Sequence, residues 1–163
     1  MKIYGIAGYK NSGKTDLMER LVAHFTAQGL TVSTIKHAHH RVDLDQPGKD
    51  SYRHREAGAQ EVLLASSTRW ALMHELRAAG EPPLSELLAK LSPVDLVLVE
   101  GFKHDPHPKI EAHRAETGQP LFSLADPSVR AIASDIRPET ALPVFDLNDT
   151  QGIADFIAAD LGL

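Results

Sequence analysis

An eight-residue segment near the start of the chain, Gly8-Tyr9-Lys10-Asn11-Ser12-Gly13-Lys14-Thr15, constrains the fold more than any other part of the sequence. It matches the pattern G-x-x-x-x-G-K-[ST] at every fixed position. An apolar segment at 2–7 precedes it, and apolar side chains follow at helical spacing over 17–25. A phosphate-binding loop (P-loop) requires this order of strand, glycine-rich turn and helix. Together with a strand-like segment at 30–35, the pattern predicts a β-α-β unit with parallel strands.

The residue types in this loop suit phosphate binding. Gly8 and Gly13 allow backbone angles that turn successive N–H groups toward one concave side, where they hold phosphate oxygens. We expect Lys14 to place its ammonium group against the β- and γ-phosphates, and Thr15 to offer its hydroxyl to Mg²⁺. The predicted phosphate-binding residues are Gly8, Lys10, Asn11, Ser12, Gly13, Lys14 and Thr15. The alternative is a glycine turn that only caps a helix.

The rest of the sequence extends this unit into an α/β fold. Apolar runs predict strands at 61–66, 69–74, 94–99, 110–113, 129–133 and 144–147, and helices at 84–91 and 153–161. The first two of these strands are separated by two residues and predict a β-hairpin. The run at 94–99 is almost wholly apolar, which is typical of a central parallel strand buried on both faces. We predict a single-domain P-loop NTPase over residues 1–163, with a mostly parallel central sheet flanked by helices and a mid-chain β-hairpin.

Composition argues against several classes of protein. The 163 residues include 17 Lys and Arg against 22 Asp and Glu, and this formal charge of −5 argues against broad electrostatic binding of nucleic acid. The absence of cysteine excludes a disulfide framework and thiolate metal ligands. No apolar run approaches the roughly 20 residues of a membrane span, and the start of the chain lacks the features of a signal peptide. We therefore expect a cytoplasmic protein that binds neither nucleic acid nor a membrane.

An acidic residue is expected at the end of a strand next to the loop, because P-loop proteins hold Mg²⁺ there directly or through water. Glu100 closes the apolar run that begins at residue 94 and precedes Gly101, so it is the predicted partner of Thr15 in binding Mg²⁺. The alternative is a strand-end carboxylate that lies in solvent. Asp95 lies at the start of the same strand, away from the expected site.

Residues 36–59 form a long polar stretch with few side chains that could fill a core. Lys36 and His37 end the second strand and should reach the carboxyl edge of the sheet, where open α/β folds bind ligands. With Asp50 and Arg53, they are candidates for contacts with Mg²⁺, the γ-phosphate or a second substrate. The alternative is a solvated, partly helical segment with charge pairs at helical spacing.

Metal and cofactor chemistry beyond Mg²⁺ finds little support in the sequence. His37, His39 and His40 are clustered as zinc ligands can be, but the chain has no cysteine and no H-E-x-x-H motif. Zinc is therefore not expected, and a zinc-binding protein remains a minor alternative. No haem, flavin or NAD is expected either.

The base of the nucleotide is not defined by a motif. Guanine-specific P-loop proteins use Asn/Thr-Lys-x-Asp, whose Asp accepts both guanine N–H groups, and this pattern is absent. Asp135, which follows the run at 129–133, and Asp126 are the candidate guanine-binding carboxylates. Each is equally well explained as an Asp that caps a turn. A small-molecule kinase or an ATP-dependent ligase on the same core is therefore the alternative function.

Three segments resemble the MobB family of molybdopterin-guanine dinucleotide biosynthesis adapter proteins. They are the loop at 8–15, the stretch from Ile35-Lys36-His37 through Asp43 to Ala59, and Leu96-Val97-Leu98-Val99-Glu100-Gly101-Phe102-Lys103. The middle stretch is the most distinctive, and the resemblance extends over nearly the whole chain. It implies a P-loop fold, a homodimer, GTP binding with Mg²⁺ and weak GTP hydrolysis.

The resemblance also implies a supporting role in molybdenum cofactor assembly. Such proteins assist the guanylyltransferase that joins GMP to molybdopterin, by supplying or positioning GTP. The expected partners are therefore GTP, a second copy of the chain, the guanylyltransferase and related cofactor-assembly proteins. Any GTPase activity should be slow, because no residue stands out as a water-positioning base or an arginine finger. The alternating segment at 69–74 offers an edge that could pair across a two-fold axis.

Overall fold

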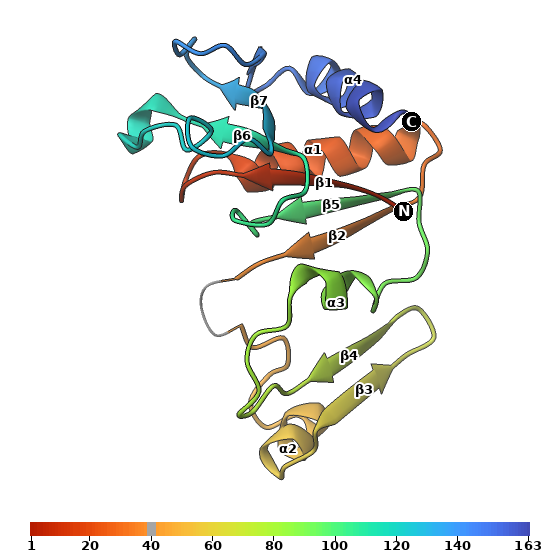
Figure 1. The fold of residues 1–163 in the computed structure, drawn as a ribbon. Coiled ribbons are helices and arrows are strands. Elements are labelled where there is room, and N and C mark those ends of the chain that lie inside the picture. Colours follow the sequence, from red (N-terminus) through yellow and green to blue (C-terminus); the bar gives the residue numbers. More distant parts are fainter. Residues whose placement is uncertain (39–41) are drawn as a thin grey trace. The chain divides into compact units, whose positions relative to one another are not determined.

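The computed structural model describes residues 1–38 and 42–163. His39 and His40, two of the three histidines considered for zinc, lie outside the described residues. The chain divides into two compact units, Met1–His37 together with Leu84–Leu163, and Ala38–Pro83. Figure 1 follows the chain through both of them. The assignment of residues 1–163 to one domain stays a prediction, and each unit is described by itself.

A six-stranded parallel sheet is the framework of the first unit, in the order β2-β5-β1-β6-β7-β8 (Figure 1). Its strands are β1 (Lys2–Ala7), β2 (Val32–Lys36), β5 (Leu96–Glu100), β6 (Lys109–His113), β7 (Val129–Ser134) and β8 (Val144–Asp146). Every neighbouring pair is parallel. All the carboxyl ends therefore meet at one edge of the sheet. The prediction of a mostly parallel sheet is confirmed.

Helices α1 (Lys14–Ala27) and α4 (Thr150–Leu161) flank this sheet and contact each other. Leu17, Leu21 and Phe25 recur at helical spacing along α1 and are buried in the main core with Tyr4 and Ile6 of β1. Helix α1 begins at Lys14, within the predicted phosphate loop at 8–15. This packing therefore fixes the loop between a buried strand and a buried helix.

Short helix α3 (Leu84–Leu88) belongs to a second, smaller core in the same unit. Its Leu84 lies with Val97 and Val99 of β5 and with Phe102. Since Leu96 and Leu98 of β5 belong to the main core, β5 is packed against apolar groups on both faces. The prediction of a central strand buried on both sides is confirmed.

Strand β6 is also fully buried, yet every second side chain on it is polar: Lys109, Glu111 and His113 (the polar row). The Glu111 carboxylate accepts hydrogen bonds from the backbone N–H groups of Phe122 and Ser123 at 3.0 and 2.9 Å. The Lys109 ammonium donates to the carbonyl of Asp105 and to Oγ of Ser128, both at 2.5 Å, and His113 contacts Oγ of Ser134 and the carbonyl of Gln119. The polar row thus ties the loops before and after β6 to the sheet.

The second unit contains helix α2 (Asp50–Glu56) and an antiparallel hairpin of β3 (Glu61–Ala65) and β4 (Trp70–His74). The predicted mid-chain hairpin is therefore confirmed. Arg55 of α2 donates to Asp43 and Asp45 at 3.1 and 3.0 Å, so the polar stretch before the helix is held by charge pairs. In the part of the chain that the structure describes, no helix is both long and apolar enough to cross a bilayer.

Candidate functional site

The predicted phosphate-binding loop connects β1 to α1, and its two fixed glycines have backbone angles that favour glycine. Gly8 and Gly13 have φ angles of +154° and +89°, which favour glycine, and a Cβ atom at Gly8 would collide with the carbonyl oxygen of Ala112. Ser12 is 1% exposed, and its hydroxyl has no hydrogen-bond partner among the described residues. Buried hydroxyls are normally paired, so this one is consistent with a loop that a ligand completes.

Positive charge gathers around this loop. The Lys14 ammonium donates to the carbonyl of Tyr9 at 2.5 Å, and the Lys103 ammonium lies 4.1 Å from the centre of the Tyr9 ring. Burial lowers the pKa of Lys14; the carboxylate of Glu100 opposes this shift, and the charges of Lys36 and Lys103 add to it. Three ammonium groups beside one carboxylate create a local potential that favours a polyanion, although the whole chain is acidic.

The predicted metal-binding pair is brought together at the carboxyl ends of the strands. The Thr15 hydroxyl donates to Oε1 of Glu100 at 3.2 Å, and Glu100 is only 8% exposed. The Lys36 ammonium lies 3.0 and 3.1 Å from the two Glu100 oxygens and 3.4 Å from Oγ1 of Thr15. A cationic group thus already sits among these oxygens. Hydroxyl and carboxylate oxygens are also the donors that Mg²⁺ prefers, so the residues fit this ion.

The other predicted residues divide between the two units. His37 follows β2, stacks on Phe102 with ring centroids 4.6 Å apart, and donates its backbone N–H to the carbonyl of Glu100 at 2.8 Å. Asp50 and Arg53 are exposed residues of α2 in the second unit, and their roles stay predictions. Asp95 accepts hydrogen bonds from the backbone and hydroxyl of Thr31, at the amino end of β5 as expected. Among the described residues there is no group of three His, Cys, Asp or Glu side chains that could hold a metal ion.

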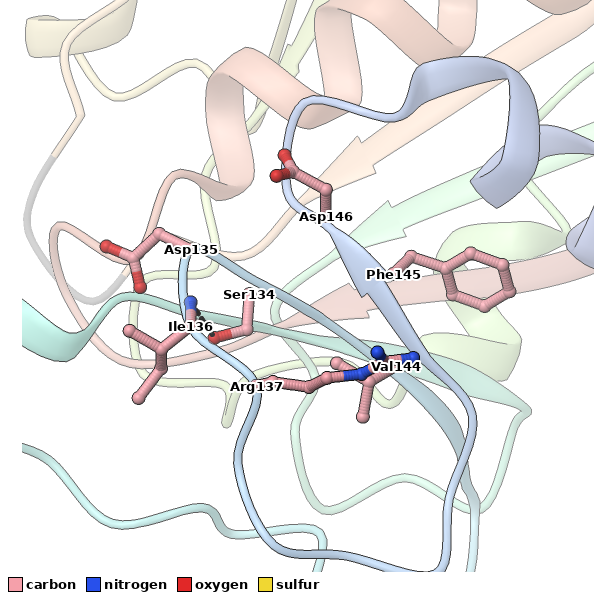
Figure 2. A pocket seen from close by; sticks show the side chains of 7 residues that line it. All are labelled: Ser134, Asp135, Ile136, Arg137, Val144, Phe145 and Asp146. Carbon is pink, nitrogen blue, oxygen red and sulfur yellow. Dashed lines mark hydrogen bonds between the residues drawn. The ribbon is translucent and has the colours of Figure 1, made fainter.

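A cavity of about 330 Å³ is lined by β8 and by the segment at the carboxyl end of β7, as Figure 2 shows. Its lining residues are Ser134, Asp135, Ile136, Arg137, Val144, Phe145 and Asp146. The Asp135 carboxylate accepts a hydrogen bond from the backbone N–H of Ala115 at 2.9 Å. Asp135 therefore lies close to the segment that follows β6, which begins with Arg114 and Ala115. Ser134, Asp135 and Asp146 bring part of this cavity to the carboxyl edge of the sheet, where open α/β folds bind ligands.

Asp126, the other candidate for guanine binding, precedes β7 and lies at the amino end of the strands. Its Oδ1 accepts from the backbone and the hydroxyl of Ser128, and its Oδ2 lies 3.4 Å from the Lys109 ammonium. Both oxygens are thus engaged in the turn that leads into β7. This arrangement matches the alternative interpretation of Asp126 as a turn-capping residue.

Two charged residues at the loop were not singled out from the sequence. Lys103 comes three residues after the end of β5, and Arg114 directly follows β6. A Cβ atom at Gly13 would lie 3.1 Å from Nε of Arg114, so the guanidinium lies against the loop. The rule that identified Glu100 could have found both residues, because charged groups just past the carboxyl ends of parallel strands face this edge.

The second unit has a cavity of its own, about 530 Å³ in volume. It is lined by Val42, Asp43, Tyr52, Arg55, Glu56, Glu75 and Arg77. The Arg55 guanidinium lies 4.9 Å from the centre of the Tyr52 ring and is paired with Asp43 and Asp45. These two carboxylates neutralise the charge of the Arg55 guanidinium. Arg55 therefore ties the polar stretch before α2 to the helix.

Comparison with known proteins assigns the chain to a family. The family described as "MobB: Molybdopterin guanine dinucleotide synthesis protein B" matches residues 3–135. The molybdopterin-guanine dinucleotide biosynthesis adapter protein of Haemophilus influenzae is 44% identical over 158 residues, which cover 95% of this chain and 86% of that protein. The adapter protein of the same name from Escherichia coli is 40% identical over 158 residues, with 95% and 90% coverage.

Solved structures agree with this assignment. The crystal structure of a MobB homolog from Bacillus stearothermophilus has a TM-score of 0.75 at 29% identity and covers 99% of both chains. That of Bacillus subtilis MobB has a TM-score of 0.78 at 27% identity, with 99% and 98% coverage. The chain therefore belongs to the MobB family, the adapter proteins of molybdopterin-guanine dinucleotide biosynthesis.

Proposed function

We propose that the chain binds GTP with Mg²⁺ at its P-loop and serves molybdopterin-guanine dinucleotide biosynthesis by supplying or positioning GTP for the guanylyltransferase. The observation that carries this proposal is the convergence of Lys14, Lys36 and Lys103 on the loop, with Glu100 as the nearby carboxylate. This arrangement suits a triphosphate, which brings several negative charges to one place.

Thr15 and Glu100 are the residues that would hold Mg²⁺. The ion would neutralise phosphate charge and orient the nucleotide when bound. The Lys36 ammonium donates to both of these side chains and so lies where a cation fits beside their oxygens. With Mg²⁺ bound, this ammonium would be available to a terminal phosphate oxygen.

Any hydrolysis at this site should be slow. The carboxylate of Glu100 is engaged by Lys36 and Thr15, and as a metal ligand it would not act as a general base. Lysines that bind phosphate in the ground state do not by themselves accelerate its transfer. A protein that binds GTP and retains it suits an adapter better than a rapid GTPase.

Asp135 is the proposed reader of guanine. The N1–H and exocyclic amine of guanine are two adjacent donors, which a carboxylate can accept together. Asp135 lines a cavity at the carboxyl edge, whereas Asp126 is engaged by Ser128 and Lys109 at the opposite edge. Adenine lacks this pair of donors, so Asp135 would distinguish the two bases.

A homodimer is supported by the hairpin of the second unit. Leu63 pairs with Leu72 and Ala65 with Trp70 across the two strands, so these side chains share one face. Leu63, Trp70 and Leu72 are 60%, 67% and 46% exposed. A two-stranded hairpin is marginal in water, and exposed apolar faces mark contact surfaces. We propose that a second copy of the chain covers this face.

The nucleotide proposal is tested by calorimetric titration with Mg·GTP. Lys14→Ala should weaken binding at least about 100-fold, because it removes the charge closest to the phosphates, while Lys90→Ala at an exposed site should not change it. Asp135→Asn should reduce the preference for GTP over ATP. Equal affinities for the parent and Lys14→Ala would refute phosphate binding at this loop.

The dimer is tested by sedimentation equilibrium at micromolar concentration. The parent should sediment at twice the chain mass of 17.8 kDa, and Trp70→Glu combined with Leu72→Glu should sediment as a monomer. Leu124→Glu, at a 75% exposed site in the first unit, should remain dimeric. A monomeric parent would contradict the proposal.

A further inference from the structure

Arg114 lies against the phosphate loop, and among the described residues its charge partner is one long ion pair. A Cβ atom at Gly13 would lie 3.1 Å from its Nε and 3.4 Å from its Nη2. Its Nε is buried and has no hydrogen-bond partner among the described residues. Its Nη1 lies 3.8 Å from Glu116, which is 70% exposed, so this ion pair is long and screened by solvent. The guanidinium therefore has unused donors beside the amino end of α1.

The strand order places Arg114 between the two halves of the site. Lys36 and Glu100, proposed for the terminal phosphates and Mg²⁺, end β2 and β5 on one side of β1, and Lys14 and Thr15 begin α1 just after β1. The cavity proposed for the base lies at β7 and β8, on the other side. Strand β6 lies between β1 and β7, and Arg114 is the first residue beyond its carboxyl end. In a nucleotide, the α-phosphate and the ribose connect the terminal phosphates to the base. They are therefore the parts expected next to Arg114, between the two halves of the site.

We infer that Arg114 binds the α-phosphate of the nucleoside di- or triphosphate, an inference that rests on the proposed function. A guanidinium has only donors and so needs an acceptor, and the α-phosphate supplies charged oxygens that can take two parallel N–H groups. Ribose hydroxyls are weaker acceptors without charge. The assignment of a phosphate rather than a sugar contact thus follows from the chemistry of the side chain.

The backbone around Arg114 is fixed before any ligand binds. The N–H of the next residue, Ala115, donates to the Asp135 carboxylate at 2.9 Å, and the ring of the preceding residue, His113, contacts Oγ of Ser134 at 3.0 Å. Arg114 is thereby tied to the same strand end that carries the proposed base-reading carboxylate. This reduces the conformational entropy that binding must remove.

The test compares Arg114→Ala with Arg130→Ala, which removes the same charge from an exposed position on β7. Affinities are measured by calorimetry for Mg·GTP, Mg·GDP and Mg·pyrophosphate, because pyrophosphate fills a diphosphate site but has no α-phosphate. Arg114→Ala should weaken GTP and GDP binding roughly 10- to 100-fold and change pyrophosphate binding less than about threefold. Arg130→Ala should leave all the affinities unchanged.

Arg114→Lys separates charge from geometry and replaces the alanine variant if that variant fails to fold. It should retain part of the GTP affinity, because a point charge remains but the planar pair of donors is lost. Equal GTP affinities for Arg114→Ala and Arg130→Ala would overturn the inference. An equal loss for GTP and pyrophosphate would overturn it too, since Arg114 would then act through the shape of the loop. A parent that binds no nucleotide would instead overturn the proposed function.

Discussion

Strands β5 and β6 are both completely buried in one sheet, but they are buried by opposite means. β5 (Leu-Val-Leu-Val-Glu) is apolar until its last residue and packs against two hydrophobic clusters. β6 (Lys-Ile-Glu-Ala-His) alternates, with Ile110 and Ala112 in the main core and the polar row on the other face. Apolar side chains cover both faces of β5 up to Glu100, whereas β6 has apolar packing on one face and side-chain hydrogen bonds on the other.

The difference lies in what covers each face. A helix with an apolar side can cover β5, but irregular loops cover β6, and loop backbone brings polar N–H and C=O groups that must be paired when buried. Glu111 accepts two such N–H groups, and Lys109 serves a carbonyl. Alternation along a strand therefore does not prove that one face is exposed to solvent.

The largest effect should come from removing the buried carboxylate of β6. Glu111→Ala leaves the N–H groups of Phe122 and Ser123 without their acceptor, which should lower the free energy of unfolding by about 3–5 kcal/mol. Urea unfolding followed by circular dichroism measures this change. The exposed Glu116→Ala serves as the control and should change stability very little. A loss below about 1 kcal/mol for Glu111→Ala would show that the loop does not depend on the polar row.

The next largest effect is on Mg²⁺ binding at the carboxyl end of β5, where Glu100 is the one charged residue of the strand. Glu100→Gln removes a negative oxygen from the proposed metal site, so about 10-fold more Mg²⁺ should be needed for full GTP binding. Nucleotide binding measured without Mg²⁺ should change less. Titration of Mg²⁺ at fixed GTP gives both values, and identical curves for variant and parent would assign Glu100 to structure alone.

A smaller effect is expected within β5 itself. Leu98→Met conserves volume and introduces no polar group, so it should cost less than about 1.5 kcal/mol. Urea midpoints of this variant and of Glu111→Ala compare the two strands directly. An equal loss of unfolding free energy for Leu98→Met and Glu111→Ala would contradict the comparison. It would mean that β5 depends on the exact shape of its apolar side chains as much as β6 depends on its buried carboxylate.

The smallest effect is a pH dependence of the free energy of unfolding that arises from His107, just before β6. Burial lowers the pKa of His107 below its ordinary value of 6.5, and the charge of Lys109 lowers it further, against Asp105 and Asp126. The unfolded chain then takes up a proton first, so stability is present above pH 6.5 and is lost as the pH falls through the lowered value. Urea midpoints at several pH values should fall less steeply for His107→Leu than for the parent. The exposed His104→Leu should follow the parent, and parallel curves for all three proteins would refute the assignment.

Much of this arrangement could be predicted from the sequence. The loop at 8–15 and the hairpin were identified because glycine positions and alternation are local signals. Glu100 was identified because it ends an apolar strand. The burial of Lys109 and Glu111 could not be predicted, because their partners lie in loops whose course no local pattern specifies. Arg114 could have been found by the rule that identified Glu100, but its place beside Gly13 depends on the order of the strands.

We propose that this loop and the cavity beside β7 and β8 together hold a guanine nucleotide. Calorimetric titration of Mg·GTP and Mg·ATP into the purified protein tests it most directly. The proposal predicts clear binding of GTP and at least about 10-fold weaker binding of ATP, the difference that a bidentate contact with the base supplies. Equal binding, or a preference for ATP, would contradict it and would favour a kinase or ligase on the same core.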